Sequence, residues 1–362
     1  MFLRTGARSL ALALVLAVVG AACGGSGGGS GGGDGIGLDD DPLAAPNESP
    51  GDRAVQITGA NRVRLFGTFS IPPAASAASV PGALIIPSAG DGTRDGSIGV
   101  GGVPDTWALD LATALSNAGV ASYRYDRRGT AESKIEPEVR LTVDDLVADA
   151  KAGVDLLAER RETMGKDISV ISYDSGGLLA LRLAASDERI KRVVLIATPG
   201  ATLADAHAAQ LSAVNGPASG EAVRATVASL IANRTLPPLN ELRSELRPLF
   251  PAAEAAFLAD LYSIDPTLDA ARIKIPVLIV VPAADRAPYA PERLAAAVPN
   301  GAAQVTTTAG GPTMSIAGRP LPVNPNDPAL HSSSMAGPVS PDVRDASAVG
   351  AITGFLSAAT PR

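Results

Sequence analysis

Short apolar segments alternate with amphipathic ones along most of the chain beyond about residue 53. Residues 54–58 and 63–71 alternate apolar and polar side chains, which predicts half-buried antiparallel strands. Five later segments are short and largely apolar, as strands buried on both faces of a parallel sheet are: 83–86, 120–124, 168–171, 193–196 and 277–281. Between them lie stretches of helical period at 107–119, 143–158, 176–185 and 290–297. This alternation predicts an α/β fold with a mostly parallel, doubly wound sheet.

One long segment interrupts this alternation. Residues 201–268 contain no strand-like run but several helical ones, so we interpret them as a helical cap inserted between two strands of the sheet. The expected organisation is a first part of the core at 53–200, the cap at 201–268 and a second part of the core at 269–362.

The N-terminal 22 residues have the pattern of an export signal. Arg4 and Arg8 precede an apolar run at 10–19, which is too short to span a membrane as a helix. Small residues then precede Cys23, and this junction resembles the bacterial lipobox, in which the cysteine is acylated. An ordinary signal peptide with an incidental cysteine is the alternative. Residues 23–52 are rich in Gly and Ser and then acidic, so they predict a flexible tether with a reach of about 30 Å. We therefore expect export and a lipid anchor at Cys23 on the bacterial cell membrane, with the domain on the extracytoplasmic side.

Composition narrows the possible partners. The net charge of −7 becomes −9 when Arg4 and Arg8 are removed (−7 − 2), and an acidic body is poorly suited to nucleic acid. One cysteine and two histidines cannot build an ordinary zinc site, so neither a metal nor another cofactor is expected. The chemistry must come from Ser, Asp, Glu and one His.

Residues 168–180 read as a strand, a sharp turn of small residues and a helix, which is the setting of a nucleophile elbow. With Ser172 and Gly176 in the two small positions, Asp174 takes the nucleophile position. Moving the pattern by one residue to select Ser175 would put Tyr173 in a small position, which a tight turn disfavours.

With this motif and several further stretches, the chain resembles the α/β-hydrolase superfamily, and specifically its bacterial esterase-type members. The supporting stretches occur in the family's order within residues 55–358, at 87–96, 123–133, 141–149, 246–266 and 275–285. The resemblance implies that Asp285 is the triad acid. It also implies that the oxyanion donors are the backbone N–H of Ser175 and one N–H from the Ser88, Ala89 and Gly90 loop.

Two triad members depart from the family pattern. Asp174 stands where the family has serine, and Thr313 stands near the place where it has histidine. His331, in the Pro- and Gly-rich stretch 309–341, is the remaining candidate base, whereas we interpret His207 as a surface residue of a cap helix.

Dehalogenases and epoxide hydrolases of the same superfamily attack with Asp. Dehalogenases, however, commonly place Trp directly after the nucleophile, where this chain has Ser175; its single Trp is Trp107. Epoxide hydrolases use paired cap tyrosines, and this cap offers Tyr262.

Two functions follow from these observations. The first is a lipid-anchored hydrolase of carboxylic esters or related apolar small molecules, with an altered triad. The second is a non-catalytic lipoprotein that binds a small molecule, since a carboxylate such as Asp174 is also stable at a helix N-terminus without any substrate.

Overall fold

The computed structural model describes residues 51–90, 92–98, 104–136, 139–283, 286–310, 314 and 344–358. Within these residues an eight-stranded sheet has the order β1-β2-β6-β3-β7-β8-β9-β10, and β4 and β5 pair separately as an antiparallel hairpin. The strands are β1 (Gly51–Thr58), β2 (Arg64–Ile71), β3 (Gly82–Ile86), β4 (Ser97–Ile98), β5 (Pro104–Asp105), β6 (Ala121–Tyr125), β7 (Ile168–Tyr173), β8 (Ile190–Ile196), β9 (Val277–Pro282) and β10 (Ala303–Thr308).

The direction of chain progression across the sheet places helices on both faces. β2 is antiparallel to β1 and β6, whereas β6, β3, β7, β8, β9 and β10 all run parallel. From β3 the chain moves to β6, then turns back through β7 and β8 to β9 and β10. Because such crossovers are right-handed, α1 lies on one face while α2, α3 and α9 lie on the other. The α-helices are α1 (Trp107–Asn117), α2 (Val143–Glu159), α3 (Gly176–Ala184), α4 (Leu203–Asn215), α5 (Pro217–Asn233), α6 (Ala255–Tyr262), α7 (Pro266–Ala270), α8 (Arg286–Tyr289), α9 (Pro291–Ala297) and α10 (Ala346–Ser357).

This architecture confirms the predicted fold class: the predicted strands and helices all form, with ends that differ by a few residues. The sequence pattern did not reveal the β4–β5 hairpin or helix α10. Short 3₁₀ helices complete the described elements: η1 (Ala60–Arg62), η2 (Pro73–Ser76), η4 (Arg247–Leu249), η5 (Ala252–Glu254) and η6 (Pro299–Gly301).

The core includes one buried ion pair that ties α2 to the chain after β6. Arg128 and Asp149 are both inaccessible to solvent, and the guanidinium donates two short hydrogen bonds to the carboxylate, of 2.5 and 2.6 Å. Asp149 also accepts a 2.9 Å hydrogen bond from the backbone N–H of Ala60. Every residue of β3, β6 and β7 is buried, which gives the strands around the elbow a rigid setting.

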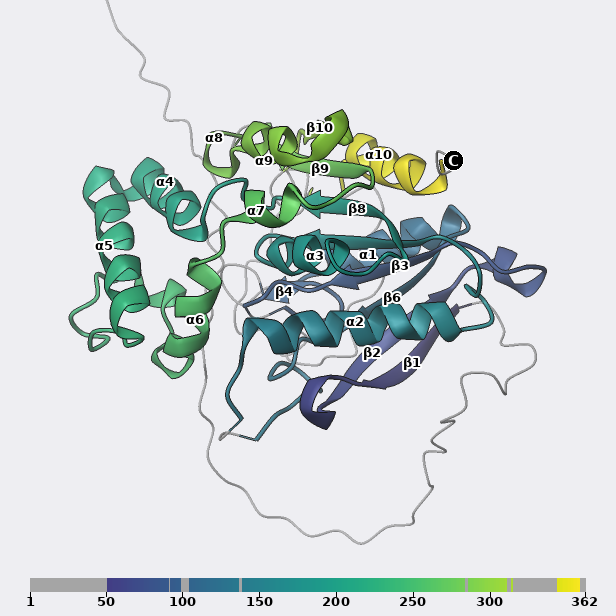
Figure 1. The fold of residues 1–362 in the computed structure, drawn as a ribbon, viewed down its shortest axis with the longest axis horizontal. Coiled ribbons are helices and arrows are strands. Elements are labelled where there is room, and N and C mark those ends of the chain that lie inside the picture. Colours follow the sequence, from purple (N-terminus) through teal and green to yellow (C-terminus); the bar gives the residue numbers. More distant parts are fainter. Residues whose placement is uncertain are drawn as a thin grey trace, which may run out of the picture.

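Helices α4, α5, α6 and α7 follow β8 and precede β9, and the first three form a group to the left of the sheet in Figure 1. We call α4–α7 the cap helices. α4 and α5 pack together as a pair, and both contact α6. An ion pair of 3.5 Å between Arg127, which follows β6, and Glu254 of η5 joins this group to the core.

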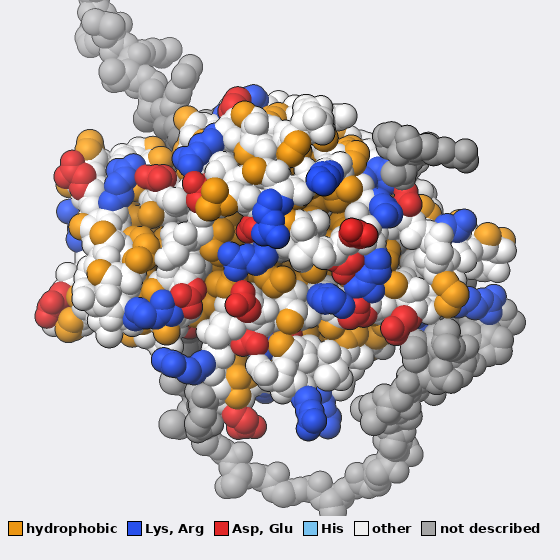
Figure 2. Space-filling model, viewed as in Figure 1, with side chains coloured by type: hydrophobic (Ala, Val, Ile, Leu, Met, Phe, Trp, Pro, Cys, Tyr) orange, Lys and Arg blue, Asp and Glu red, His pale blue; other side chains and the backbone are white. Residues whose placement is uncertain are grey.

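Basic and acidic side chains are interspersed over the face that Figure 2 shows. Ion pairs of the described residues include Arg189 with Asp155 and Arg234 with Asp260. Among the described residues, no helix is both long enough and apolar enough to cross a bilayer.

Candidate active site

Asp174 occupies the sharp turn between β7 and α3. Its φ is 50°, in the left-handed region that side chains other than glycine rarely adopt, whereas Ser175 is in the right-handed helical region with φ −63°. The N–H of Asp174 donates a 2.9 Å hydrogen bond to the carbonyl oxygen of Ile196, the last residue of β8. The strained position of the turn is therefore Asp174 and not Ser175, which is the register expected from the sequence.

The two glycines after the turn allow α3 to start close to neighbouring chain segments. A Cβ at Gly176 would lie 2.4 Å from the carbonyl oxygen of Pro87, and one at Gly177 would lie 2.1 Å from Oγ1 of Thr198. Glycine is needed at both places because real Cβ atoms essentially never approach another heavy atom so closely. The close approach at Gly176 brings the loop after β3 against the elbow, and the one at Gly177 brings the chain after β8 against it.

The loop after β3 holds three further predicted site residues, Ser88, Ala89 and Gly90. Oγ of Ser88 and Oγ of Ser175 are 2.9 Å apart, and the N–H of Ala89 donates a 3.2 Å hydrogen bond to Oγ of Ser175. The N–H of Gly90 makes a longer contact of 3.4 Å with Oγ of Ser88. The structure thus brings Ser88, Ala89, Gly90 and Ser175 together beside Asp174, with the Ser175 hydroxyl already paired to the Ala89 N–H.

His207 lies on a cap helix, as expected, but its side chain is only partly exposed. His207 is partly buried on α4, and its Nδ1 is 2.9 Å from the hydroxyl oxygen of Tyr262 on α6. Burial lowers the pKa of His207, and the nearby carboxylate of Asp174 raises it in part. Burial also raises the pKa of the Tyr262 phenol, and the charge of Asp174 raises it further. The cap thus brings an imidazole and a phenol within electrostatic range of the elbow carboxylate.

Several predicted residues lie outside the described residues: Asp285, His331, Thr313 and Cys23. Met314 is described: it is 1% exposed, and its carbonyl oxygen accepts a 2.8 Å hydrogen bond from the N–H of Asp345. A buried, apolar side chain thus stands close to the place where the family resemblance led us to expect a histidine.

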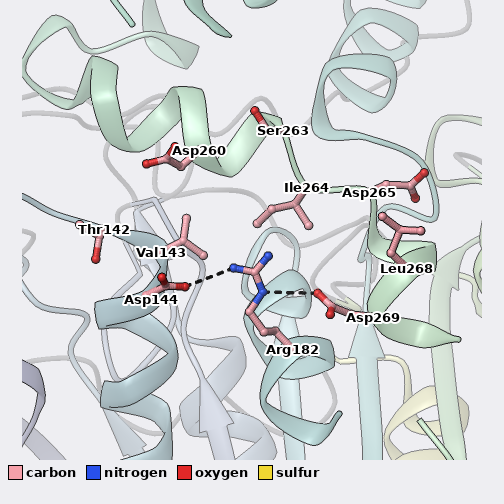
Figure 3. A pocket seen from close by; sticks show the side chains of 10 residues that line it. All are labelled: Thr142, Val143, Asp144, Arg182, Asp260, Ser263, Ile264, Asp265, Leu268 and Asp269. Atoms are coloured by element: carbon pink, nitrogen blue, oxygen red, sulfur yellow. Dashed lines mark hydrogen bonds and ion pairs between the residues drawn. The ribbon is translucent and has the colours of Figure 1, made fainter. Parts of the chain in front are cut away.

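A cavity of about 570 Å³ lies apart from this cluster. Figure 3 shows Arg182 of α3 pointing into it and pairing with Asp144 of α2 and Asp269 of α7, at 3.4 Å each. The remaining lining residues come from α2, from α6 and α7 and from the chain between them: Thr142, Val143, Asp260, Ser263, Ile264, Asp265 and Leu268. Neither Asp174 nor His207 lines this cavity, so its ion pairs belong to the contact between core and cap rather than to the elbow.

Among the described residues, no group of three or more His, Cys, Asp or Glu side chains is arranged to hold a metal ion.

Comparisons with known proteins agree with the fold. DcsB, solved in complex with its substrate analogue, matches with a TM-score of 0.52 and 16% identity, over 84% of this chain and 98% of that one. A hypothetical protein of Pseudomonas aeruginosa matches with a TM-score of 0.51 and 16% identity, over 75% and 90% of the two chains. An esterase of Pyrococcus furiosus gives a TM-score of 0.48 and 16% identity, over 73% and 83%. No curated protein matches the sequence.

The two structures with the higher TM-scores, at these identities, show a shared fold. The sequence itself matches the Alpha/beta hydrolase family over residues 80–315, which is more than half of the 362 residues and includes the elbow and the cap helices. The chain therefore belongs to the Alpha/beta hydrolase family.

Proposed function

We propose that this chain is a hydrolase of small, apolar carboxylic esters in which Asp174 replaces the usual nucleophilic hydroxyl. The observation that carries the proposal is the left-handed backbone of Asp174 at the strand–helix turn, next to the N–H groups of Ser175 and Ala89. Such strain costs about 1–3 kcal/mol, and residues that bear it cluster at active sites; Asp174 is one of several described residues with positive φ, and it is the one at the strand–helix turn after β7.

The chemistry of a carboxylate determines how the ester is cleaved. Attack by Asp174 on an ester carbonyl would form an anhydride, which is less stable than the ester itself. A water molecule is therefore the better nucleophile, and the Asp174 charge assists its deprotonation. The developing oxyanion is stabilised by the N–H groups of Ser175 and Ala89 once the Ser175 hydroxyl turns away from Ala89.

A second candidate is the hydrolysis of a substrate with an electrophilic saturated carbon, such as an epoxide. Here Asp174 bonds to the ring carbon, the C–O bond breaks, and a phenol gives its proton to the oxygen that leaves the carbon. Water then hydrolyses the ester formed on Asp174. The observation that favours this candidate is the phenol of Tyr262, which lies within electrostatic range of Asp174 and, with a pKa raised above its ordinary value of about 10, carries its proton at neutral pH.

The full chain assayed on p-nitrophenyl butyrate and on styrene oxide tests both candidates. We expect Asp174→Asn to lose at least about a hundredfold in kcat, whereas Asp155→Asn, on the exposed side of α2, keeps it. One turnover in ¹⁸O water separates the routes: direct hydrolysis puts ¹⁸O into the product, but the covalent route puts it first into Asp174. If neither substrate is turned over, the proposal of a hydrolase is rejected, and the alternative of a non-catalytic protein that binds a small molecule remains.

We further propose that Cys23 carries the lipid that anchors the chain to the extracytoplasmic face of a bacterial membrane. Acyl chains contribute about 0.8 kcal/mol for each buried CH₂, and two or more make a stable anchor. In bacteria expressing the full chain, the wild type should remain with washed membranes and incorporate an alkyne-labelled fatty acid. Cys23→Ser should release the protein and lose the label; a variant that stays with the membrane and keeps the label would contradict the proposal.

A further inference from the structure

The path of the chain starts helix α4, which carries His207, close to the elbow. Asp174 is hydrogen-bonded to Ile196 at the end of β8, and the chain passes from there through Thr198 to α4. Thr202 begins this helix, accepting a 3.2 Å hydrogen bond from the N–H of Asp205. His207 follows on the second turn of α4. The first helix of the cap thus begins close to the elbow.

Tyr262 fixes the imidazole. Its hydroxyl oxygen is 2.9 Å from Nδ1, and the two ring centroids lie 5.7 Å apart in an edge-on arrangement. Tyr262 is itself 3% exposed and packs against Phe250, with ring centroids 5.6 Å apart. When Nδ1–H donates to the phenol oxygen, the lone pair of Nε2 is free to accept a proton.

The charged groups around His207 favour the transfer of a proton to its Nε2. Burial lowers the pKa of the imidazole and so favours its neutral form, whereas the carboxylate of Asp174 raises that pKa in part because it stabilises the imidazolium that forms when a proton arrives. Several other charged groups on α4 and on the helices packed against it are paired with one another. Arg224 of α5 pairs with Asp205 of α4 at 3.3 Å, Asp260 of α6 pairs with Arg234, and Arg286 of α8 pairs with Glu292.

We propose that His207 is the general base of the site, that Asp174 balances its charge, and that Tyr262 is a positioning residue for the imidazole. This inference rests on the proposed hydrolase function. A water molecule adds to the ester carbonyl while its proton passes to Nε2 of His207. The tetrahedral intermediate then expels the alcohol, which takes that proton, and His207 returns to its neutral form with Asp174 ionised throughout. A histidine of the cap thereby performs the task for which the family resemblance pointed to the loop that contains His331.

Kinetics of the full chain test the role of each group. We expect His207→Gln to lower kcat by about 10²–10⁴-fold, whereas Asp205→Asn, on the same helix, retains it. Tyr262→Phe should lower kcat with little change in KM and should shift the acid limb of the pH profile. Loss of activity in His331→Gln together with retention in His207→Gln would overturn the proposal.

A second measurement does not depend on turnover. The chain has two histidines, so NMR signals of their ring protons are assigned by comparison with His331→Gln. We expect Asp174→Asn to lower the pKa of His207, because the variant removes the anion that raises it. An unchanged pKa would reject the pairing of the two residues. Absence of turnover in the wild type would instead reject the hydrolase, so the two failures are distinguishable.

Discussion

The N–H of Ala89 donates its hydrogen bond to the hydroxyl of Ser175, 3.2 Å away, so the protein's own side chain occupies a donor suited to a substrate oxyanion. Removing this hydroxyl should leave the donor free. Because one such donor is worth about 10²–10³ in kcat, we expect Ser175→Ala to raise kcat for p-nitrophenyl esters by about tenfold or more.

Ser175→Thr is the matched control, since it keeps a hydroxyl at the same place and should leave kcat near that of the wild type. A fall in kcat for Ser175→Ala, with retention in Ser175→Thr, would show instead that the hydroxyl itself assists the reaction. Stopped-flow release of p-nitrophenolate distinguishes these outcomes.

Helix α3 should not tolerate a side chain at its first residue. A Cβ at Gly176 would lie 2.4 Å from the carbonyl oxygen of Pro87, so we expect Gly176→Ala to destabilise the fold by about 3 kcal/mol. Gly350→Ala is the control, because Gly350 of α10 is exposed and has no atom within 4 Å of the new Cβ. Gly350→Ala should raise the free energy of unfolding by about 0.5–1 kcal/mol, since alanine favours a helix more than glycine does. Urea unfolding measures both, and equal effects would contradict this view of the elbow.

The buried pair Arg128 and Asp149 should be costly to break from one side only. Asp149→Asn removes the carboxylate that accepts both short hydrogen bonds and leaves the buried guanidinium with only the more distant carboxylate of Asp145, at 3.7 Å, so we expect a loss of about 3 kcal/mol in the free energy of unfolding. The double variant Arg128→Met with Asp149→Leu should lose less than Asp149→Asn, because no uncompensated charge remains buried. The exposed pair Lys151 and Asp155 on the same helix is the comparison, and Lys151→Ala should cost less than about 1 kcal/mol. A loss as small for Asp149→Asn as for Lys151→Ala would contradict the prediction.

Stability should depend on pH through His207. Its pKa is lower in the folded chain than its ordinary value of about 6.5, so below that pH the unfolded chain binds the proton more readily. The contribution of His207 is thus fully present above pH 6.5 and is lost as the pH falls. We expect His207→Gln to reduce the difference between the free energies of unfolding at pH 7.5 and pH 5, measured in urea. An identical difference in both proteins would show that burial does not perturb this imidazole.

The sequence predicted the sheet and the elbow because both depend on short-range patterns. Apolar runs such as 277–281 predict buried parallel strands, and the spacing of Ser172 and Gly176 around Asp174 predicts the strand–helix turn. The pair of His207 and Tyr262 was missed because the residues are 55 positions apart, on two helices whose relative placement depends on tertiary packing. The contact of Ala89 with Ser175 joins segments 86 positions apart, and no periodicity records such a pairing. β4 and β5 have two residues each, too few to show any alternation.

Strand β1 begins at the end of the sheet where the parallel strands start, and Asp174 lies at the other end, where they finish. Gly51 pairs with Ile71, and the neighbouring Ser70 pairs with Ser122 near the start of β6, so β1 begins level with the amino ends of the parallel strands. Asp174 and the cap helices follow the carboxyl ends of β7 and β8, on the other side of the molecule (Figure 1). Any attachment upstream of Gly51 therefore joins the domain on the side away from the cap helices. The carboxylate of Asp174 then lies on the side away from the attachment, and compounds dissolved in the surrounding medium reach that side without first crossing the surface to which the protein is attached.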